Sequence, residues 1–197
     1  MKQLTSRQNQ AKATKLKITE KAMELIKIHG FDSVRITDIC ESANISTGAF
    51  YHYFQSKEKI IENAYMKIDL LVEESVESIQ YNSSYDKILE IFKQAMKSIE
   101  ELGYKFMADI FKHSISSPSK YSIEATRYPY DAIRKAIEKG VSSGEFLPTT
   151  DSIQLSWDCM RIGRGMVFDW CFYEGSYSLP EETEKVVKVF LKGFKSK

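Results

Sequence analysis

The stretch that decides the fold runs from Ile36 to Lys57 and reads ITDICESANISTGAFYHYFQSK. Its spacing predicts two short helices, at about 36–43 and 47–53, joined by a tight turn. Cys40 and Ala43 supply small residues where such helices cross, and Asn44 is the residue type that best replaces glycine at a positive φ. The outward side of the second helix carries hydroxyl groups, rings and a glycine, a surface that suits a DNA groove: Ser46, Thr47, Gly48, Tyr51 and His52.

The rest of the chain is also helical in pattern. Only four prolines and nine glycines occur in 197 residues, and apolar residues recur at three- and four-residue spacing. We therefore expect an all-α protein of about nine helices, the others lying at about 10–29, 57–79, 88–99, 103–114, 125–142, 150–173 and 180–195. Ser56 is a suitable cap for the helix that follows it, and Ser178 and Glu181 have the spacing of a capping box.

The stretch around the turn resembles the N-terminal domain of TetR-family transcriptional repressors. That family's signature has a Thr opening the second helix, an Ala-Gly-Val-Ser turn, an aromatic recognition helix and a Ser-Lys step. Here these elements are Thr37, Ala43–Ser46, Phe50–Phe54 and Ser56–Lys57, with Asn44 in place of the usual Gly and Cys40 in place of the usual Ala. The match is specific over about residues 15–63. It implies a helix-turn-helix DNA-binding domain at 1–60 and a helical effector-binding and dimerisation domain at 61–197.

Roles in DNA binding follow from this resemblance. Thr37 and Lys57 stand near helix N-termini, where free N–H groups favour phosphates, so we expect both to clamp the DNA backbone. Tyr51 and His52 are also expected to contact phosphates. The base edges are then left to the leading end of the recognition helix, namely Ser46, Thr47 and Gly48. Tyr53 and Phe54 are interpreted as packing residues.

The distribution of charge supports a nucleic-acid partner, although the whole chain carries a formal charge of only +1. Residues 1–60 hold ten Lys or Arg and six Asp or Glu, a net charge of +4, which leaves −3 for the remainder. A basic head on a mildly acidic body is typical of a phosphate-binding module joined to a region with another partner. Chance asymmetry of a solvated surface explains the difference about as well.

The second half is expected to bind a small-molecule effector and to form a homodimer. An apolar or aromatic pocket is predicted from Phe106, Met107, Phe111, Tyr128, Trp157, Met160, Met166 and Trp170. For any single one of these residues, ordinary core is the better interpretation. The helix at 150–173 is apolar on more than one face, which predicts a dimer interface with the last helix, made by Ile153, Gly163, Val167, Val186, Phe190 and Phe194. The sequence leaves open whether Arg161 and Arg164 pair with Asp158 or Asp169 or whether one faces an acidic ligand.

Other function classes are disfavoured. The histidines have no metal-ligand spacing, and the chain contains no GxGxxG, P-loop or GxSxG motif, so we expect no enzyme, no metal and no cofactor. The three cysteines indicate a reducing compartment, and no apolar run approaches the roughly 18 residues of a spanning helix, which predicts a cytoplasmic protein without membrane contact.

The favoured function is a ligand-responsive repressor that binds a palindromic operator on double-stranded DNA as a dimer. A basic helix at 10–29 lying on a membrane surface would explain that segment alone. A helical carrier would explain the second half but not residues 36–57. The remaining alternative is a different helix-turn-helix protein, or a helical small-molecule-binding protein whose head has another role or no role on DNA.

Overall fold

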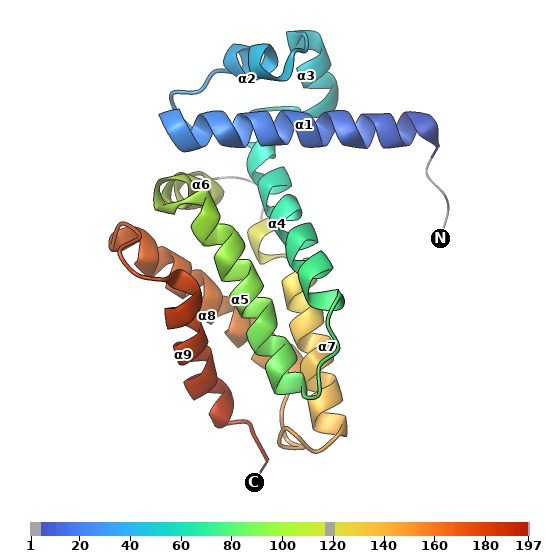
Figure 1. Ribbon diagram of the computed structural model, residues 1–197, viewed down its shortest axis with the longest axis vertical. Helices are drawn as coiled ribbons and strands as arrows, with labels where there is room; N and C mark the ends of the chain where they lie inside the picture. Colours follow the sequence, from blue (N-terminus) through green and yellow to red (C-terminus); the bar gives the residue numbers. More distant parts are fainter. Residues whose placement is uncertain (1–4, 117–120, 197) are drawn as a thin grey trace.

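The computed structural model describes residues 5–116 and 121–196, which fold into nine α-helices and one short 3-10 helix (Figure 1). The all-α prediction and its count of about nine helices are confirmed for this part of the chain. Within the same residues, none of the helices is long and apolar enough to cross a membrane. The helices divide by position into a small head and a larger body, with α4 passing from one to the other (Figure 1).

The head consists of α1 (Ser6–His29), α2 (Ile36–Ala43) and α3 (Thr47–Tyr53). α1 lies across the top of the molecule, and α2 and α3 lie on the side of α1 that faces away from the body (Figure 1). The two short helices have the bounds expected from the sequence. Apolar side chains from these helices and the loop after α3 form a dry core, each at most 2% exposed: Ile18, Ala22, Ile39, Phe50 and Phe54.

The turn between α2 and α3 depends on Asn44. Its φ of 54° and ψ of 55° are left-handed, as its residue type predicts. The N–H of Ile45 then donates to the carbonyl of Cys40 at 2.9 Å, which closes α2. The hydroxyl of Ser46 accepts the N–H of Ala49 at 3.1 Å and caps α3. Local backbone chemistry therefore sets the angle at which α3 leaves the turn.

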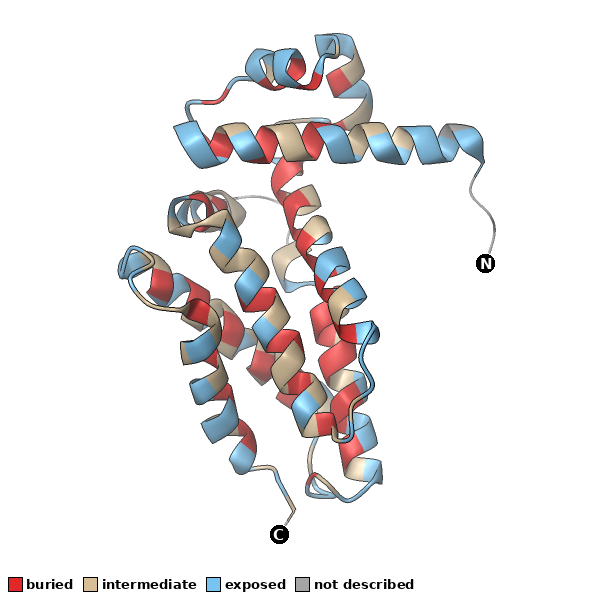
Figure 2. Ribbon diagram, in the orientation of Figure 1, coloured by how far each residue is buried: buried red, intermediate tan, exposed pale blue. Residues whose placement is uncertain are grey.

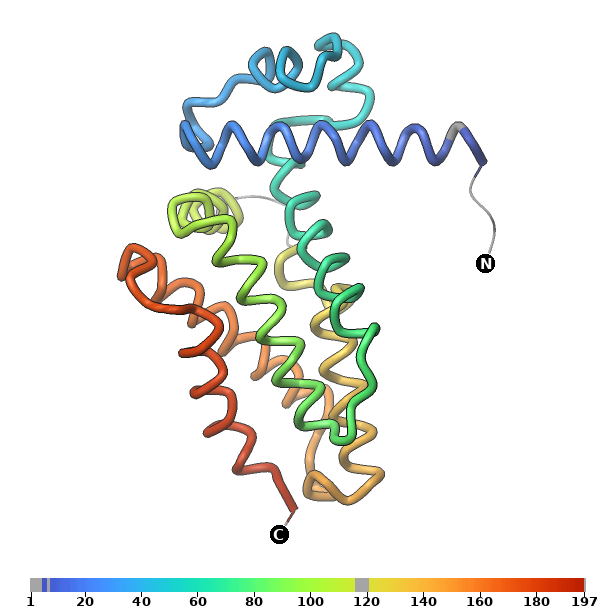
Figure 3. The backbone as a smooth tube through the Cα atoms, in the orientation of Figure 1, coloured from blue at the N-terminus to red at the C-terminus, as the bar shows by residue number. Residues whose placement is uncertain are grey.

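α5 is the central helix of the body. The body's helices are α4 (Lys59–Glu77), α5 (Ser84–Leu102), α6 (Tyr104–Ser116), α7 (Tyr128–Ser142), α8 (Ser152–Phe172) and α9 (Leu179–Lys192), with the 3-10 helix η1 (Tyr121–Ile123) before α7. The chain descends from the head through α4 and returns upward through α5 (Figure 3). α5 packs against α4, α7 and α9, and its apolar stripe of Ile88, Ile91 and Phe92 is buried. Burial follows the inner faces of the helices, while the outer faces of α5 and α9 are exposed (Figure 2).

Two of the expected helix caps do not form. α4 begins at Lys59, after Glu58, so Ser56 lies outside the cap position. Ser178 does precede α9, but its side chain makes no capping bond. The N–H of Leu179 instead donates to Oε1 of Glu100 on α5, at 2.9 Å. A carboxylate from another helix has taken the place of the capping box, and local spacing cannot predict such a partner.

The two glycines inside α8 have different surroundings. A Cβ added at Gly163 would lie 3.2 Å from Cε1 of Phe92 on α5, so the missing side chain allows that ring to approach, as expected of a mid-helix glycine. A Cβ at Gly165 would meet no atom within 4 Å. Close approach of a neighbour therefore explains Gly163 but not Gly165.

Candidate nucleic-acid interface and ligand cavity

The outward surface of the head carries most of the predicted DNA-binding residues. Exposed side chains or backbone are found at Thr37, Ser46, Thr47, Gly48, Tyr51 and His52. The ring of Tyr51 packs edge-on against buried Phe50, with centroids 5.6 Å apart, and still leaves the side chain 53% exposed. A Cβ at Gly48 would meet only Oγ of Ser46, at 3.9 Å, so the packing of the head itself does not require a glycine there. This face is free to meet another surface at short range.

Lys57 differs from its expected role. Its Nζ donates to the backbone carbonyls of Phe31 at 2.6 Å and Val34 at 2.9 Å, and it lies 4.3 Å from the centroid of the Phe31 ring. The ammonium group therefore holds the loop between α1 and α2 against the start of α4. The predicted phosphate contact of Lys57 assumes that the Ser56–Lys57 step stands at a helix N-terminus. In the structure, the ammonium group of Lys57 donates instead to two carbonyls of the protein.

The head is fastened to the body through α6. The N–H of Phe31 donates to Oδ2 of Asp109 at 2.7 Å, and Lys112 forms an ion pair with Asp32. Hydrogen bonding to Lys112 lowers the pKa of the Asp32 carboxyl, which strengthens the ionised form of the pair. At the other end of the α5–α6 corner, Nζ of Lys27 donates to the carbonyl of Glu101 at 2.6 Å. Two contacts therefore connect α6 to the loop that precedes α2.

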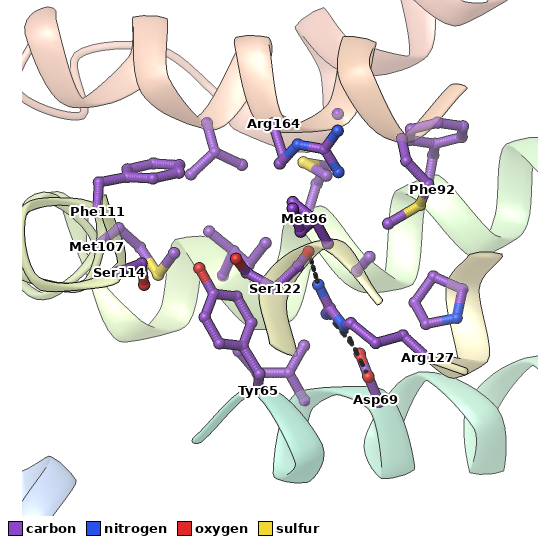
Figure 4. A pocket seen from close by; sticks show the side chains of 18 of the residues that line it. Tyr65, Asp69, Phe92, Met96, Met107, Phe111, Ser114, Ser122, Arg127 and Arg164 are labelled. Carbon is purple, nitrogen blue, oxygen red and sulfur yellow. Dashed lines mark hydrogen bonds and ion pairs between the residues drawn. The ribbon is translucent and has the colours of Figure 1, made fainter. Parts of the chain in front are cut away.

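A cavity of about 400 Å³ lies inside the body, bounded by α4, α5, α6, η1, α7 and α8 (Figure 4). Its wall is mostly apolar, with large contributions from Phe92, Met96, Met107 and Phe111. The volume falls in the lower part of the range of small-molecule sites, and mostly apolar walls with few polar groups are typical of such sites. The cavity touches both α4 and α6, and each of these helices also packs against α1 of the head.

The polar side of the cavity contains a buried ion pair. Arg127 donates from Nε to Oδ2 of Asp69 at 2.9 Å and from Nη2 to Oδ1 at 2.7 Å, and its Nη1 donates to the carbonyl of Ser122 at 3.1 Å. Burial alone would lower the pKa of Arg127, but the Asp69 carboxylate outweighs burial and the pKa is raised. Tyr65 lies beneath the guanidinium, 4.8 Å from its Cζ to the ring centroid. Every oxygen of this carboxylate is thus engaged by one arginine.

A second arginine in the cavity has no such partner. Arg164 comes from α8, across the cavity from Tyr65 and Asp69 on α4 (Figure 4). Its Nη1 is buried and makes no hydrogen bond to any described residue. Burial lowers the pKa of Arg164, and the charges of Arg127 and Arg161 lower it further. Asp158 pairs with Arg161 and Asp169 accepts the hydroxyl of Tyr177, which closes the two pairings that the sequence leaves open for Arg164.

The comparisons with known proteins agree with this geometry. Residues 18–64 match the family model described as bacterial regulatory proteins, tetR family, and solved structures with the same description have the fold of almost the whole chain. By sequence, the head of this chain is therefore similar to that of the TetR family. The family that this model describes consists of regulatory proteins.

Known proteins are similar to this chain at two levels. The HTH-type transcriptional regulator UidR of Escherichia coli K12 is 40% identical over 55 residues, which cover 28% of each chain. Thermus thermophilus FadR in complex with lauroyl-CoA has a TM-score of 0.74 at 18% identity, over 93% of this chain and 96% of that one. Bacillus subtilis FadR in complex with stearoyl-CoA has a TM-score of 0.64 at 16% identity, over 91% and 98%. The relative at 40% identity thus matches only 55 residues, whereas the two structures that cover almost the whole chain share its fold at under 20% identity.

Three of the eight residues predicted for the pocket line the cavity of the body: Met107, Phe111 and Met160. The other five lie elsewhere. Tyr128 donates its hydroxyl to Glu77 at 2.8 Å, Trp157 stacks on Tyr130, and the indole of Trp170 donates to the carbonyl of Tyr177 at 2.9 Å. Phe106 is core, and Met166 is half-buried outside the lining. Helical periodicity shows that a face is apolar but does not show whether it meets a neighbour or a void.

Sequence reasoning missed the α4 and α5 walls of the cavity. A usable signal was present at Asp69, a carboxylate in the apolar run of α4 that the structure leaves 4% exposed. Lone charges in apolar helices are almost always paired or functional. Its partner Arg127 lies 58 residues away, so the pair itself is a product of the fold.

The residues predicted for the dimer interface divide into two groups. Gly163 and Val167 line the cavity, so they are not available on an outer face. Ile153 and Val186 are 56% and 41% exposed, and Phe190 and Phe194 are half-buried and in ring contact with each other. Further large apolar side chains on the outer surface are those of Phe168, Phe172 and Val189. Phe168 connects this surface to the cavity, because it contacts Phe172 at 4.9 Å and cavity-lining Phe111 at 5.9 Å between ring centroids.

Proposed function

We propose that this TetR-family regulator is a homodimeric repressor that is released from a palindromic operator by a small apolar or aromatic effector. The proposal rests on one observation: α4 and α6 form walls of an apolar cavity and also hold the head. Residues 1–60 are assigned to DNA binding, and residues 61–197 to effector binding and dimerisation.

The DNA contacts follow from the outward face of the head. We assign base reading to Ser46, the N-cap of α3, and to Thr47, its first residue, and close approach to the groove to the bare backbone at Gly48. Tyr51, His52 and Thr37 are assigned to phosphates. Lys57 is kept in this proposal as a positioning residue, since it orients the loop that leads into α2.

Effector binding is coupled to the head through population shift. A ligand changes the spacing of two heads only if it binds one arrangement of α4 and α6 more tightly than the other. The Asp109 bond to Phe31 and the Lys112 pair with Asp32 transmit a movement of α6. α4 transmits its own movement directly, because the helix begins under the head and contributes Tyr65 and Asp69 to the cavity.

Dimerisation is assigned to the outer faces of α8 and α9, which pack on each other. Several large apolar side chains are exposed there, including Ile153, Phe168, Phe172 and Val189. An exposed apolar surface of this kind marks an association site, and a twofold axis would present two heads to the two half-sites of a palindrome.

The apolar character of the proposed effector is supported by the cavity wall. Two of the solved structures with a similar fold are complexes with acyl-CoA molecules, which carry long apolar chains. The apolar cavity inside this body is suited to the same kind of chain.

The test begins with fragments of the source genome that the purified protein retains, which define the operator. We expect Tyr51→Ala to weaken binding to all fragments and Thr47→Ala to change the preferred bases. Thr149→Ala, at an exposed threonine in the loop between α7 and α8, is the matched control and leaves both properties unchanged. Retention of no fragment at low salt would contradict the proposal and favour a helical small-molecule-binding protein without a DNA role.

A further inference from the structure

The cavity contains one positive charge in excess. Asp69 and Arg127 cancel, since the carboxylate receives two hydrogen bonds from that guanidinium. Arg164 then remains as a cation in a wall that is otherwise mostly apolar (Figure 4). Arginine stays protonated in proteins, so the charge cannot be relieved by losing a proton.

No described residue neutralises Arg164. The carboxylates on its own helix have other partners, Arg161 for Asp158 and the Tyr177 hydroxyl for Asp169. The nearest charges across the cavity are those of the Asp69–Arg127 pair, whose carboxylate is already engaged. A buried guanidinium nitrogen without an acceptor costs free energy that a bound anion would recover.

The surroundings of Arg164 define the rest of the ligand. Apart from the ion pair, the polar groups in the wall are hydroxyls, including those of Tyr65, Ser114 and Ser122, and the remaining lining is aliphatic, aromatic or thioether. A planar guanidinium matches a carboxylate with two parallel hydrogen bonds. The volume of about 400 Å³ leaves room for a modest apolar body.

We propose that the cavity binds an apolar monocarboxylate, with the carboxylate paired to Arg164 and the hydrocarbon part against Phe92, Met96 and Met107. The inference deepens the proposed function by naming the chemical class of the effector. The carboxylate is the recognised group, so esterification or thioesterification of the acid removes it.

Calorimetric titration of the purified full-length protein with decanoate and with methyl decanoate is the test. We expect decanoate to bind about tenfold or more tightly than the ester, because one charge-assisted pair separates them. Arg164→Gln removes this preference and binds both compounds alike. Arg161→Gln, three residues earlier on α8 and paired outside the cavity with Asp158, retains the preference.

Equal affinity of the wild-type protein for acid and ester, or binding of neither, overturns the proposal, as does an Arg164→Gln variant that is folded by circular dichroism and still prefers the acid. A release assay on the operator separates this result from the proposed function. Decanoate that binds through Arg164 without releasing DNA leaves the site inference standing and contradicts the effector role. If the protein without ligand does not bind DNA, the proposed repressor function is contradicted, while the calorimetric result on the cavity is unaffected.

Discussion

The head and the body of this molecule treat a half-buried cation in opposite ways. In the head, Lys57 is satisfied by two carbonyls of the neighbouring loop, at 2.6 and 2.9 Å, and by the face of Phe31. In the body, Arg164 has a buried Nη1 with no acceptor among the described residues. Lys57 thus has its acceptors within the protein, whereas the buried Nη1 of Arg164 has none among the described residues.

The largest expected effect comes from the one satisfied charge pair of the cavity. Asp69→Ala leaves Arg127 buried and unpaired, which should lower the free energy of unfolding by about 3–5 kcal/mol. Asp158→Ala removes a carboxylate from the exposed Arg161 and should cost at most about 1 kcal/mol. Urea denaturation of both variants measures the difference. Equal losses of stability in the two variants would show that burial does not increase the contribution of the Asp69–Arg127 pair.

The next largest expected loss of stability comes from Lys57 in the head. Lys57→Met leaves two loop carbonyls without their donor and should cost about 1.5–3 kcal/mol. Lys59→Met, which removes an exposed lysine from its pair with Glu62, should cost at most about 1 kcal/mol. The salt dependence of operator binding distinguishes a Lys57 that only holds the loop before α2 from a Lys57 that contacts a DNA phosphate. A slope that falls by about one unit in Lys57→Met, with stability unchanged, would restore the phosphate role.

Arg164 should respond in the opposite direction. Arg164→Met replaces an unpaired cation by an apolar side chain of similar length, so the unliganded protein should gain about 1 kcal/mol. Arg161→Met, at the exposed pair, should change stability by less than about 0.5 kcal/mol. Thermal unfolding without added ligand measures both. A stability loss in Arg164→Met would mean that the guanidinium already has a partner and that the contrast with Lys57 is wrong.

The smallest effect concerns the two glycines of α8. Gly165→Ala meets open space and should stabilise the helix by roughly 0.5–1 kcal/mol. Gly163→Ala places a methyl group 3.2 Å from Phe92, inside the cavity wall, so the gain is reduced and the cavity shrinks. Unfolding midpoints and decanoate affinity together separate the two positions. Equal gains with unchanged affinity would remove Gly163 from the ligand site.

The same contrast explains how far the sequence predicts the structure. The helix-turn-helix of the head depends on residues close together in the sequence. Asn44 sets the turn and Ser46 caps α3, so the sequence predicts the bounds of α2 and α3 correctly. The cavity depends on contacts across the chain. Asp69 meets Arg127 from 58 residues away, and Glu100 caps α9 from 79 residues away. Periodicity predicts which residues are apolar, but only the packing of six elements leaves a void among them.

A chain of aromatic contacts connects the cavity to the outer surface of the body. Phe111 faces the cavity and also supports Phe168, which in turn touches Phe172 on the outer surface. A substitution at Phe111 that adapts the cavity to a new molecule therefore also alters the surface assigned to subunit pairing. In a biosensor designed from this chain, ligand choice is better changed through Met96 or Met160, whose flexible thioethers line the cavity without taking part in that aromatic chain.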